Sequence, residues 1–293
     1  MSPRTADAKV DRPLEGRIAV VTGAGSGLGA AMARVYAGAG MAVASLDIDE
    51  RAAEATALML AEDFGVPTTA LRTDVGDAGS VEAAARHVSS TLGGCDLLAA
   101  NVGVQQFGAI ERLTEQDWEW ILNVNVMGTV RSVREFLPLI RSRTGWRHIV
   151  VTASSGALSP AVRLGAYQTT KFAVMGFAET LRQELADEGI GVSILFPAGM
   201  MTRHLESSAL ARPPQFGESV TLPGDIEAML AGSQMVDGDV VTAEEAVGGL
   251  LDELLSNQPY VLTHGSYRTS YNQRRDAIDA AFDRMEHRLD RES

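Results

Sequence analysis

A glycine-rich turn between an apolar strand and a helix constrains the fold of this chain more than any other feature. Residues 18–22, Ile-Ala-Val-Val-Thr, predict a buried strand. Residues 23–29 follow with three glycines in the pattern Gly-x-x-x-Gly-x-Gly, and a helical pattern comes next. This order directs free backbone N–H groups toward a diphosphate, although it also occurs as a plain tight turn. We therefore expect the turn to hold a dinucleotide through Gly23, Ser26, Gly27, Leu28 and Gly29.

Strand and helix patterns alternate along the chain without a linker between them. The apolar runs that predict strands are 18–22, 42–46, 68–72, 96–100, 148–152, 191–196 and 259–263. Helical patterns in the gaps favour an α/β fold, a doubly wound parallel sheet of about seven strands with helices on both faces. A chain of 293 residues with 45% hydrophobic residues can bury one large core, so we expect a single domain over residues 1–293.

An acidic residue ends the second predicted strand. Asp47 stands 18 residues after Gly29, where a carboxylate can accept hydrogen bonds from the ribose hydroxyls of adenosine. Its charge would repel a 2′-phosphate, and the glycine turn carries no arginine. We therefore expect the cofactor to be NAD and not NADP. A second interpretation, Asp47 as the N-cap of a helix that starts near Glu50, stays open beside the first.

Tyr167 and Lys171 are one helical turn apart, and Ser154 precedes the tyrosine by 13 residues. Positions i and i+4 share a helix face, so the ammonium can lie near the phenol and favour phenolate. A phenol ordinarily titrates near ~10, too high for a general base at neutral pH without such help. Ser154 follows the strand predicted over 148–152, so its hydroxyl can face the same point. The pair alone also arises by chance on many helices, and the other motifs give it weight.

Taken in order, these motifs resemble the short-chain dehydrogenase/reductase family over roughly residues 14 to 205. The resemblance implies a Rossmann-type fold and a nicotinamide-dependent oxidoreductase. Two positions depart from the usual family pattern, because Val102 precedes Gly103 and Ala198 follows Pro197. The motifs that carry the resemblance are Thr22-Gly23-x-x-x-Gly27-x-Gly29, Asp74-Val75, Asn101-Val102-Gly103, Asn125, Ser154, Tyr167-x-x-x-Lys171, and Pro197 followed by Thr202.

The resemblance implies a role for each catalytic residue. Tyr167 would be the general acid or base, and Lys171 would hold the nicotinamide ribose and lower the tyrosine pKa. Ser154 would hydrogen-bond the substrate oxygen, with Ser155 as its rival, and Asn125 would position a water in a proton relay. Six further residues would surround the cofactor: Asp74 and Val75 beside the adenine, Asn101 and Gly103 along the groove, and Pro197 and Thr202 after the sixth strand.

Residues 203–258 mix apolar side chains with Pro, Gly and Ser, which predicts either a mobile lid over the substrate or two ordinary covering helices. The pocket suits an apolar or aromatic secondary alcohol or ketone. A weaker similarity links the chain to dehydrogenases of lignin-derived benzylic aryl ethers. Hydroxysteroid or terpene alcohols, and a catalytically silent NAD-binding sensor or scaffold, are the alternatives. The expected substrate contacts are Gln105, Phe107, Leu158, Val162 and Leu205.

Charge and composition limit the kinds of partner that the protein can have. A net charge of −13 argues against nucleic acid and anionic membrane surfaces, so a small-molecule substrate is expected. The single cysteine forms no internal disulfide, the five histidines have no metal-ligand spacing, and no metal site is expected. Without a signal peptide or a membrane-spanning run, the chain is expected in the cytoplasm. The tail, residues 266–293, predicts a helix with an apolar stripe that packs on its own domain or on a neighbouring subunit. The family resemblance implies a homodimer or homotetramer.

Overall fold

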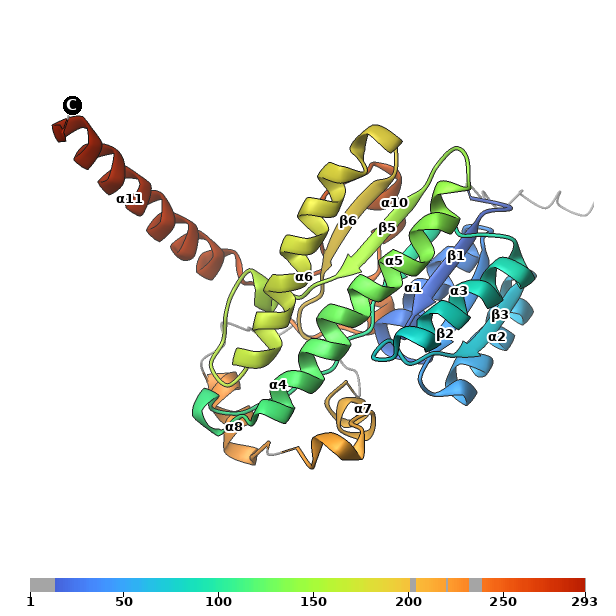
Figure 1. Cartoon of the computed structure of the whole chain (residues 1–293), viewed down its shortest axis with the longest axis horizontal. Helices are drawn as coiled ribbons and strands as arrows, with labels where there is room; N and C mark the ends of the chain where they lie inside the picture. Colours follow the sequence, from blue (N-terminus) through green and yellow to red (C-terminus); the bar gives the residue numbers. More distant parts are fainter. Residues whose placement is uncertain (1–13, 201–203, 220, 232–238, 293) are drawn as a thin grey trace, which may run out of the picture.

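Seven parallel strands form one sheet at the centre of the molecule (Figure 1). The structure is a computed structural model that describes residues 14–200, 204–219, 221–231 and 239–292. The strand order is β3-β2-β1-β4-β5-β6-β7, and this doubly wound parallel sheet confirms the predicted fold class. The strands are β1 Ile18–Thr22, β2 Ala42–Asp47, β3 Thr68–Arg72, β4 Leu97–Ala100, β5 His148–Thr152, β6 Gly191–Phe196 and β7 Tyr260–Leu262.

Helices cover both faces of the sheet because its central strands are apolar on both sides. Val20 and Val21, neighbours in β1, are both fully buried but belong to opposite cores. Such continuous apolar strands are typical of parallel sheets with two covered faces. The first core packs the sheet against α1 Gly27–Gly38, α9 Ala243–Ala246 and α10 Leu250–Leu255. The second packs it against α3 Ala78–Leu92, α5 Gly128–Arg141 and α6 Gly165–Glu184.

The helical stretch from residue 115 to residue 141 is interrupted by a wider turn. It consists of α4 Glu115–Ile121, a π-helical turn η2 Leu122–Met127, and α5. A π-helical turn inserts one residue into the helical repeat and is often found at functional sites. Here the turn contains Asn125, whose side chain is buried.

Four further helices complete the fold: α2 Glu50–Phe64, α7 His204–Leu210, α8 Pro223–Ala231 and α11 Arg268–Glu292. The last of these extends away from the body of the molecule (Figure 1). At its base Arg274 donates to the Ala157 carbonyl at 3.1 Å and lies over the Phe172 ring. No helix of the described chain has the length and apolar character needed to cross a membrane.

Candidate active site

One large cavity opens at the carboxyl edge of the sheet, where ligands bind in open parallel sheets. Its volume of about 1430 Å³ exceeds the ~300–1000 Å³ of an ordinary small-molecule site, so it has room for a dinucleotide and a substrate together. Five separate strands bring residues to its lining through the loops that follow them: Gly23, Asp47, Asn101, Ser154 and Pro197.

The glycine turn has no space for side chains on its inner side. A Cβ added to Gly29 would lie 1.9 Å from the Gly23 carbonyl oxygen, and Gly23 itself has a left-handed φ of +70°. Ser26 is the N-cap of α1, yet its side chain makes no capping hydrogen bond in the structure. The first N–H groups of α1 therefore remain available to an anionic group, and Ser26, Gly27 and Leu28 all line the cavity. These features fit the diphosphate of a dinucleotide.

Asp47 holds the glycine turn and does not cap α2. Its Oδ2 accepts from the Gly25 N–H at 2.8 Å, and its Oδ1 accepts from the Asp49 N–H at 3.0 Å. The N-cap of α2 is Asp49, whose carboxylate accepts from the Ala52 N–H at 3.2 Å. The interpretation of Asp47 as a helix cap was therefore wrong by two residues, since both acids stand just before the helix. Asp47 lines the cavity beside the turn.

Asn101 joins the ends of three strands. Its Nδ2 donates to the Thr22 carbonyl at 3.2 Å, and its Oδ1 accepts from the Thr152 hydroxyl at 3.2 Å. Gly103 follows at the point where the chain passes Lys171, and a Cβ there would lie 3.0 Å from the lysine Nζ. Both residues line the cavity, as the resemblance implied.

The Asn125 side chain fixes the loop after β4 through hydrogen bonds to its backbone. Its Oδ1 accepts from the Val104 N–H at 2.7 Å, and its Nδ2 donates to the Val104 carbonyl at 2.9 Å. The same Nδ2 donates to the Thr170 hydroxyl on α6 at 2.9 Å. The π-helical turn therefore connects the loop to the helix that carries Tyr167 and Lys171.

Burial raises the pKa of the Tyr167 phenol, and its interactions with Ser154 and with the Gln105 side chain act in the opposite direction. All three residues line the cavity. Ser154 also accepts from the Gly156 N–H at 3.1 Å, which fixes its hydroxyl at the start of a short turn. The contact with the tyrosine favours Ser154 over Ser155, whose N–H is bonded to the Pro197 carbonyl.

Lys171 is 4% exposed, and its Nζ donates to the Thr152 carbonyl at 3.0 Å. Burial lowers the pKa of the lysine to about 8. Its Nζ lies 5.6 Å from the centre of the Tyr167 ring. The sequence suggested that Lys171 lowers the pKa of Tyr167. In the polypeptide by itself that pKa is raised, because loss of solvation on burial outweighs the hydrogen bonds.

Several expected contacts lie elsewhere. Within the described chain the cavity lining includes neither Asp74 nor Val75: the Asp74 carboxylate accepts from the Gly76 N–H, and Val75 is buried against Gly128. Leu158 and Val162 are also outside the lining, since Leu158 packs toward the core below α6 and Val162 is exposed. Gln105, Phe107 and Leu205 do line the cavity. Thr202 lies outside the described residues.

Four residues that the sequence did not single out for this site line the cavity: Gln168, His204, Tyr267 and Arg274. Burial and the charge of Lys171 lower the pKa of His204 to about 4, so its imidazole is neutral at physiological pH. Its position two residues after Thr202 was the only signal available. Among the described residues, no group of three or more His, Cys, Asp or Glu side chains could hold a metal ion.

Comparison with known proteins agrees with this geometry. The family model described as short chain dehydrogenase matches residues 17–212, and the chain belongs to this family of oxidoreductases. It is 28% identical to a C alpha-dehydrogenase of Sphingobium sp. over 91% of this chain and 87% of that protein. It is 32% identical to a D-threitol dehydrogenase of Mycolicibacterium smegmatis over 77% of this chain and 93% of that protein.

A solved structure extends the agreement to the whole fold. A short-chain dehydrogenase/reductase from Burkholderia phymatum, in complex with NAD, superposes with a TM-score of 0.83 at 30% identity. The match covers 92% of this chain and 96% of that one.

The buried lysine leads to a stability prediction. Below pH ~8 the folded protein holds a buried ammonium at a cost, and this cost disappears as pH rises from about 8 to the ordinary value of 10.5. We expect Lys171→Met to be more stable than the wild type by about 1–2 kcal/mol at about pH 7, after the lost bond to Thr152 is counted. The difference should shrink toward pH ~10. Urea unfolding at several pH values measures this, and a variant less stable at every pH would contradict it.

Proposed function

We propose that this protein is an NAD-dependent oxidoreductase that interconverts a secondary alcohol and a ketone on an apolar or aromatic substrate. The observation that carries the proposal is the placement of Ser154, Tyr167 and the buried Lys171 together in the lining of the large cavity. The names of the similar dehydrogenases support it, because threitol is an alcohol.

Ser154, Tyr167 and Lys171 each have a separate role in the direction of alcohol oxidation. Ser154 and Tyr167 bind the alcohol oxygen between their hydroxyls, and Tyr167 takes its proton as the carbonyl forms. Lys171 places a positive charge behind the ring, which stabilises the phenolate as it develops. A nicotinamide cofactor held at the glycine turn would supply the acceptor for the hydride of the carbinol carbon. In the reduction direction the same tyrosine returns the proton.

The cofactor preference rests on the position of Asp47. Its carboxylate lines the cavity next to the glycine turn, at the end of β2, where the adenosine ribose of a dinucleotide lies in this fold class. A 2′-phosphate at this point would meet a negative charge that is already fixed by two backbone N–H groups. NAD is therefore favoured.

The substrate end of the cavity is mainly apolar. Phe107 and Leu164 are buried in a cluster that includes Tyr167, and Met229 packs on the same cluster from α8. All three line the cavity. An aromatic ring next to the reacting carbon would fill such a wall, which supports a benzylic alcohol of the kind that the aryl-ether resemblance suggested.

The direct test is turnover. Purified protein with NAD⁺ would be offered benzylic, aryl-ether, aliphatic and steroid secondary alcohols, and NADH formation followed by absorbance. We expect the highest kcat/KM for the aromatic alcohols. If no alcohol is turned over while calorimetry still detects NAD⁺ binding, the protein is a silent NAD-binding protein and the proposed reaction is wrong.

Substitution of Asp47 tests the cofactor choice. Asp47→Ala should weaken NAD⁺ binding and lower its advantage over NADP⁺ by about tenfold or more, because a charged hydrogen-bond acceptor is worth about 1.5–3 kcal/mol. Asp49→Ala is the matched control: it removes the α2 cap, with a loss of stability of about 1 kcal/mol, and should leave the preference unchanged. An unchanged NAD/NADP ratio in Asp47→Ala would contradict the assignment.

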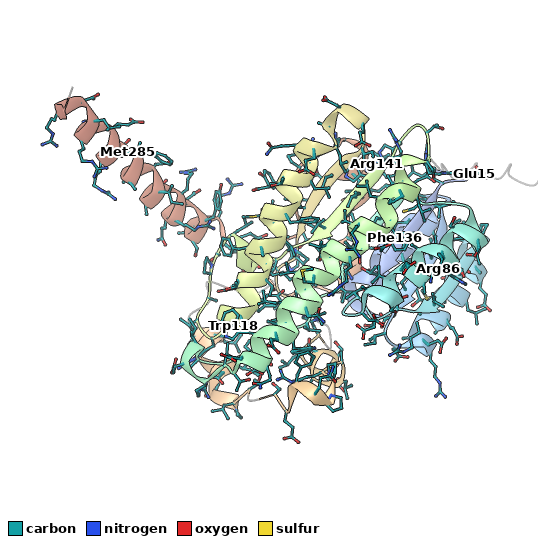
Figure 2. All side chains as sticks on the ribbon, viewed as in Figure 1. Glu15, Arg86, Trp118, Phe136, Arg141 and Met285 are labelled. Atoms are coloured by element: carbon teal, nitrogen blue, oxygen red, sulfur yellow. The ribbon has the colours of Figure 1, made fainter. Side chains whose placement is uncertain are left out.

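We also propose that the enzyme is a homo-oligomer and that α11 takes part in its interface, besides the helices from α4 to α6. Figure 2 shows α11 and its Met285 side chain away from the body. Ile278, Phe282, Met285 and Leu289 are 38–56% exposed, and their spacings of four, three and four residues form a narrow heptad stripe. Such a stripe is typical of helix-to-helix pairing.

The flanks of the stripe favour a parallel pair of α11 helices. One flank carries Asp279 and Glu286, and the other carries Arg274 and Arg288. Parallel pairing brings opposite flanks together, whereas antiparallel pairing would bring like charges together.

Disulfide formation tests this pairing. Met285→Cys would face its own copy across a parallel pair, and we expect a disulfide-linked dimer under mild oxidation. His287→Cys, on the opposite side of the helix, is the control and should stay monomeric on a non-reducing gel. The natural Cys95 is buried and does not compete. Equal crosslinking of the two variants, or none, would contradict the pairing.

A further inference from the structure

The segment after β6, for which a mobile lid and two covering helices were both predicted, is joined to the body by three ion pairs among the described residues. Arg212, two residues after α7, pairs with Asp117 of α4 at 2.7 Å, and their side chains are only 4% and 1% exposed. Asp225 of α8 pairs with Arg112 and, at 3.6 Å, with Arg163. These pairs connect the described part of the segment to the body, where it forms one wall of the cavity.

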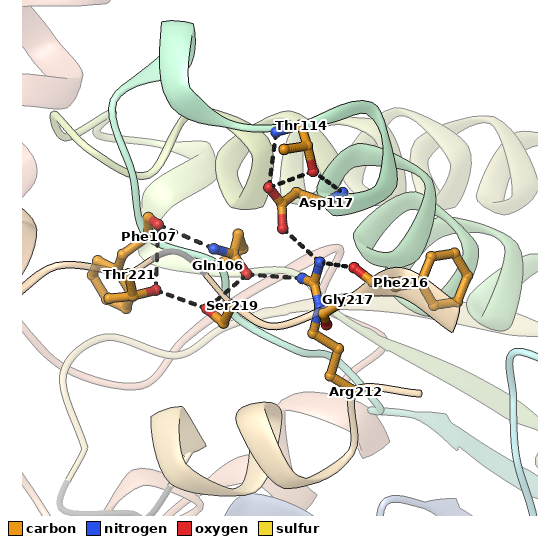
Figure 3. Close-up of polar contacts among 9 residues, drawn as sticks. All are labelled: Gln106, Phe107, Thr114, Asp117, Arg212, Phe216, Gly217, Ser219 and Thr221. Atoms are coloured by element: carbon orange, nitrogen blue, oxygen red, sulfur yellow. Dashed lines mark hydrogen bonds and ion pairs between the residues drawn. The ribbon is translucent and has the colours of Figure 1, made fainter. Parts of the chain in front are cut away.

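The Arg212 guanidinium satisfies several groups at once (Figure 3). It donates to the Phe216 carbonyl at 2.5 Å, to the Gly217 carbonyl at 2.8 Å and to the Gln106 Oε1 at 3.2 Å. It also lies 4.9 Å from the centre of the Trp120 ring. Only the planar, many-donor group of arginine can make this set of contacts, so a lysine here would keep the charge and lose most of the geometry.

Gln106 connects this cluster to the loop after β4. Its Oε1 accepts from both Arg212 and Ser219, and its Nε2 donates to the Phe107 carbonyl (Figure 3). The side chain is buried and both ends of its amide are occupied. The backbone at residue 106 is therefore held from the side of the α7–α8 segment.

Gln105, the next residue back along the chain, reaches the catalytic tyrosine. Its backbone N–H donates to the Ser208 hydroxyl on α7 at 2.9 Å. Its side chain lines the same cavity as Tyr167, and its interaction with the phenol lowers the pKa of that group. The same α7 segment thus holds the loop on both sides of this residue, through Ser208 and through Arg212. A shift of α7 or of the Arg212 cluster would move the amide away from the phenol.

We infer that Arg212 is a positioning residue for the proposed reaction: by fixing Gln106 it keeps the Gln105 amide on the Tyr167 hydroxyl. The inference rests on the proposed function of Tyr167 as proton acceptor. An amide that donates to the phenolate stabilises the reactive form of the base, so its loss makes the tyrosine a weaker acid. Loss of one such hydrogen bond corresponds to a shift of about half to one pH unit.

Kinetic pH profiles separate this role from a purely structural one. The pH at which kcat for alcohol oxidation rises should be higher by about half to one pH unit in Arg212→Lys and in Gln105→Met. In the double variant the shift should equal that of Gln105→Met alone, because Arg212 acts through Gln105. A profile that stays in place in Arg212→Lys, or shifts that simply add, would overturn the inference.

The ion pairs of Asp225 supply the matched control. Arg112→Met weakens this other anchor of the same wall and leaves Arg163 near the Asp225 carboxylate. In the described chain the Arg112–Asp225 pair makes no hydrogen bond with Gln105 or Gln106. We expect it to raise KM without moving the pH profile. If Arg112→Met shifts the profile as much as Arg212→Lys does, any loosening of the wall has this effect and Arg212 has no specific role.

A measurement that does not depend on turnover separates the positioning role of Arg212 from the proposed function. In protein labelled with ¹³C at the tyrosine ring, the Tyr167 signal is assigned by its absence in Tyr167→Phe, and its titration reports the phenol directly. Arg212→Lys should raise the titration midpoint by the same half to one pH unit. If the wild type turns over no alcohol, the proposed function fails, yet this shift still supports the positioning role. An unchanged midpoint contradicts it.

Discussion

The structure depends on the burial of one ammonium group and one phenol on the same face of α6. The Lys171 Nζ has a neutral partner, the Thr152 carbonyl at the end of β5, and burial lowers its pKa to about 8. The neighbouring phenol is also buried, with a raised pKa. Burial shifts both pKa values toward the neutral forms, yet the lysine stays charged below pH ~8, so the folded protein carries the cost of a buried ammonium at neutral pH. Perturbed groups of this kind are typical of functional sites.

The surroundings of this pair are arranged by constraints on space and hydrogen bonding. Gly103 is small because a Cβ would press on the lysine, and Gly29 is small because a Cβ would strike the Gly23 carbonyl. Asn125 uses a π-helical turn to join the loop after β4 to α6 through three hydrogen bonds. The cofactor groove and the proton-transfer site are therefore built on the same strand ends.

Local patterns predicted the parts that local physics controls. All seven strands were found within a residue or two of their expected bounds. The signal is clearest for the central strands, whose apolar runs are buried on both faces, whereas the edge strands β3 and β7 are only partly buried. The order of motifs also gave the family, which the match over residues 17–212 confirms. Asp47 was placed correctly at the end of β2, whereas the cap role belongs to Asp49, since two nearby acids give the same signal before a helix.

Contacts between distant segments could not be predicted from the sequence. Arg212 and Asp117 are 95 positions apart, and nothing in either local pattern shows that they form a buried ion pair. The same limit explains Leu158 and Val162, which follow Ser154 closely but lie outside the cavity lining. The long-range ion pairs connect the segment after β6 to the body, and no local pattern could show which residues pair.

The central claim is that Tyr167 transfers the proton of the substrate, and one comparison of rates tests it most directly. NADH formation from the best alcohol would be measured for the wild type, for Tyr167→Phe and for Ser155→Ala, with NAD⁺ binding measured for each by calorimetry. The account predicts a loss of at least ~100-fold in kcat for Tyr167→Phe, with NAD⁺ affinity nearly intact and Ser155→Ala close to wild type. Retained turnover in Tyr167→Phe would contradict the account.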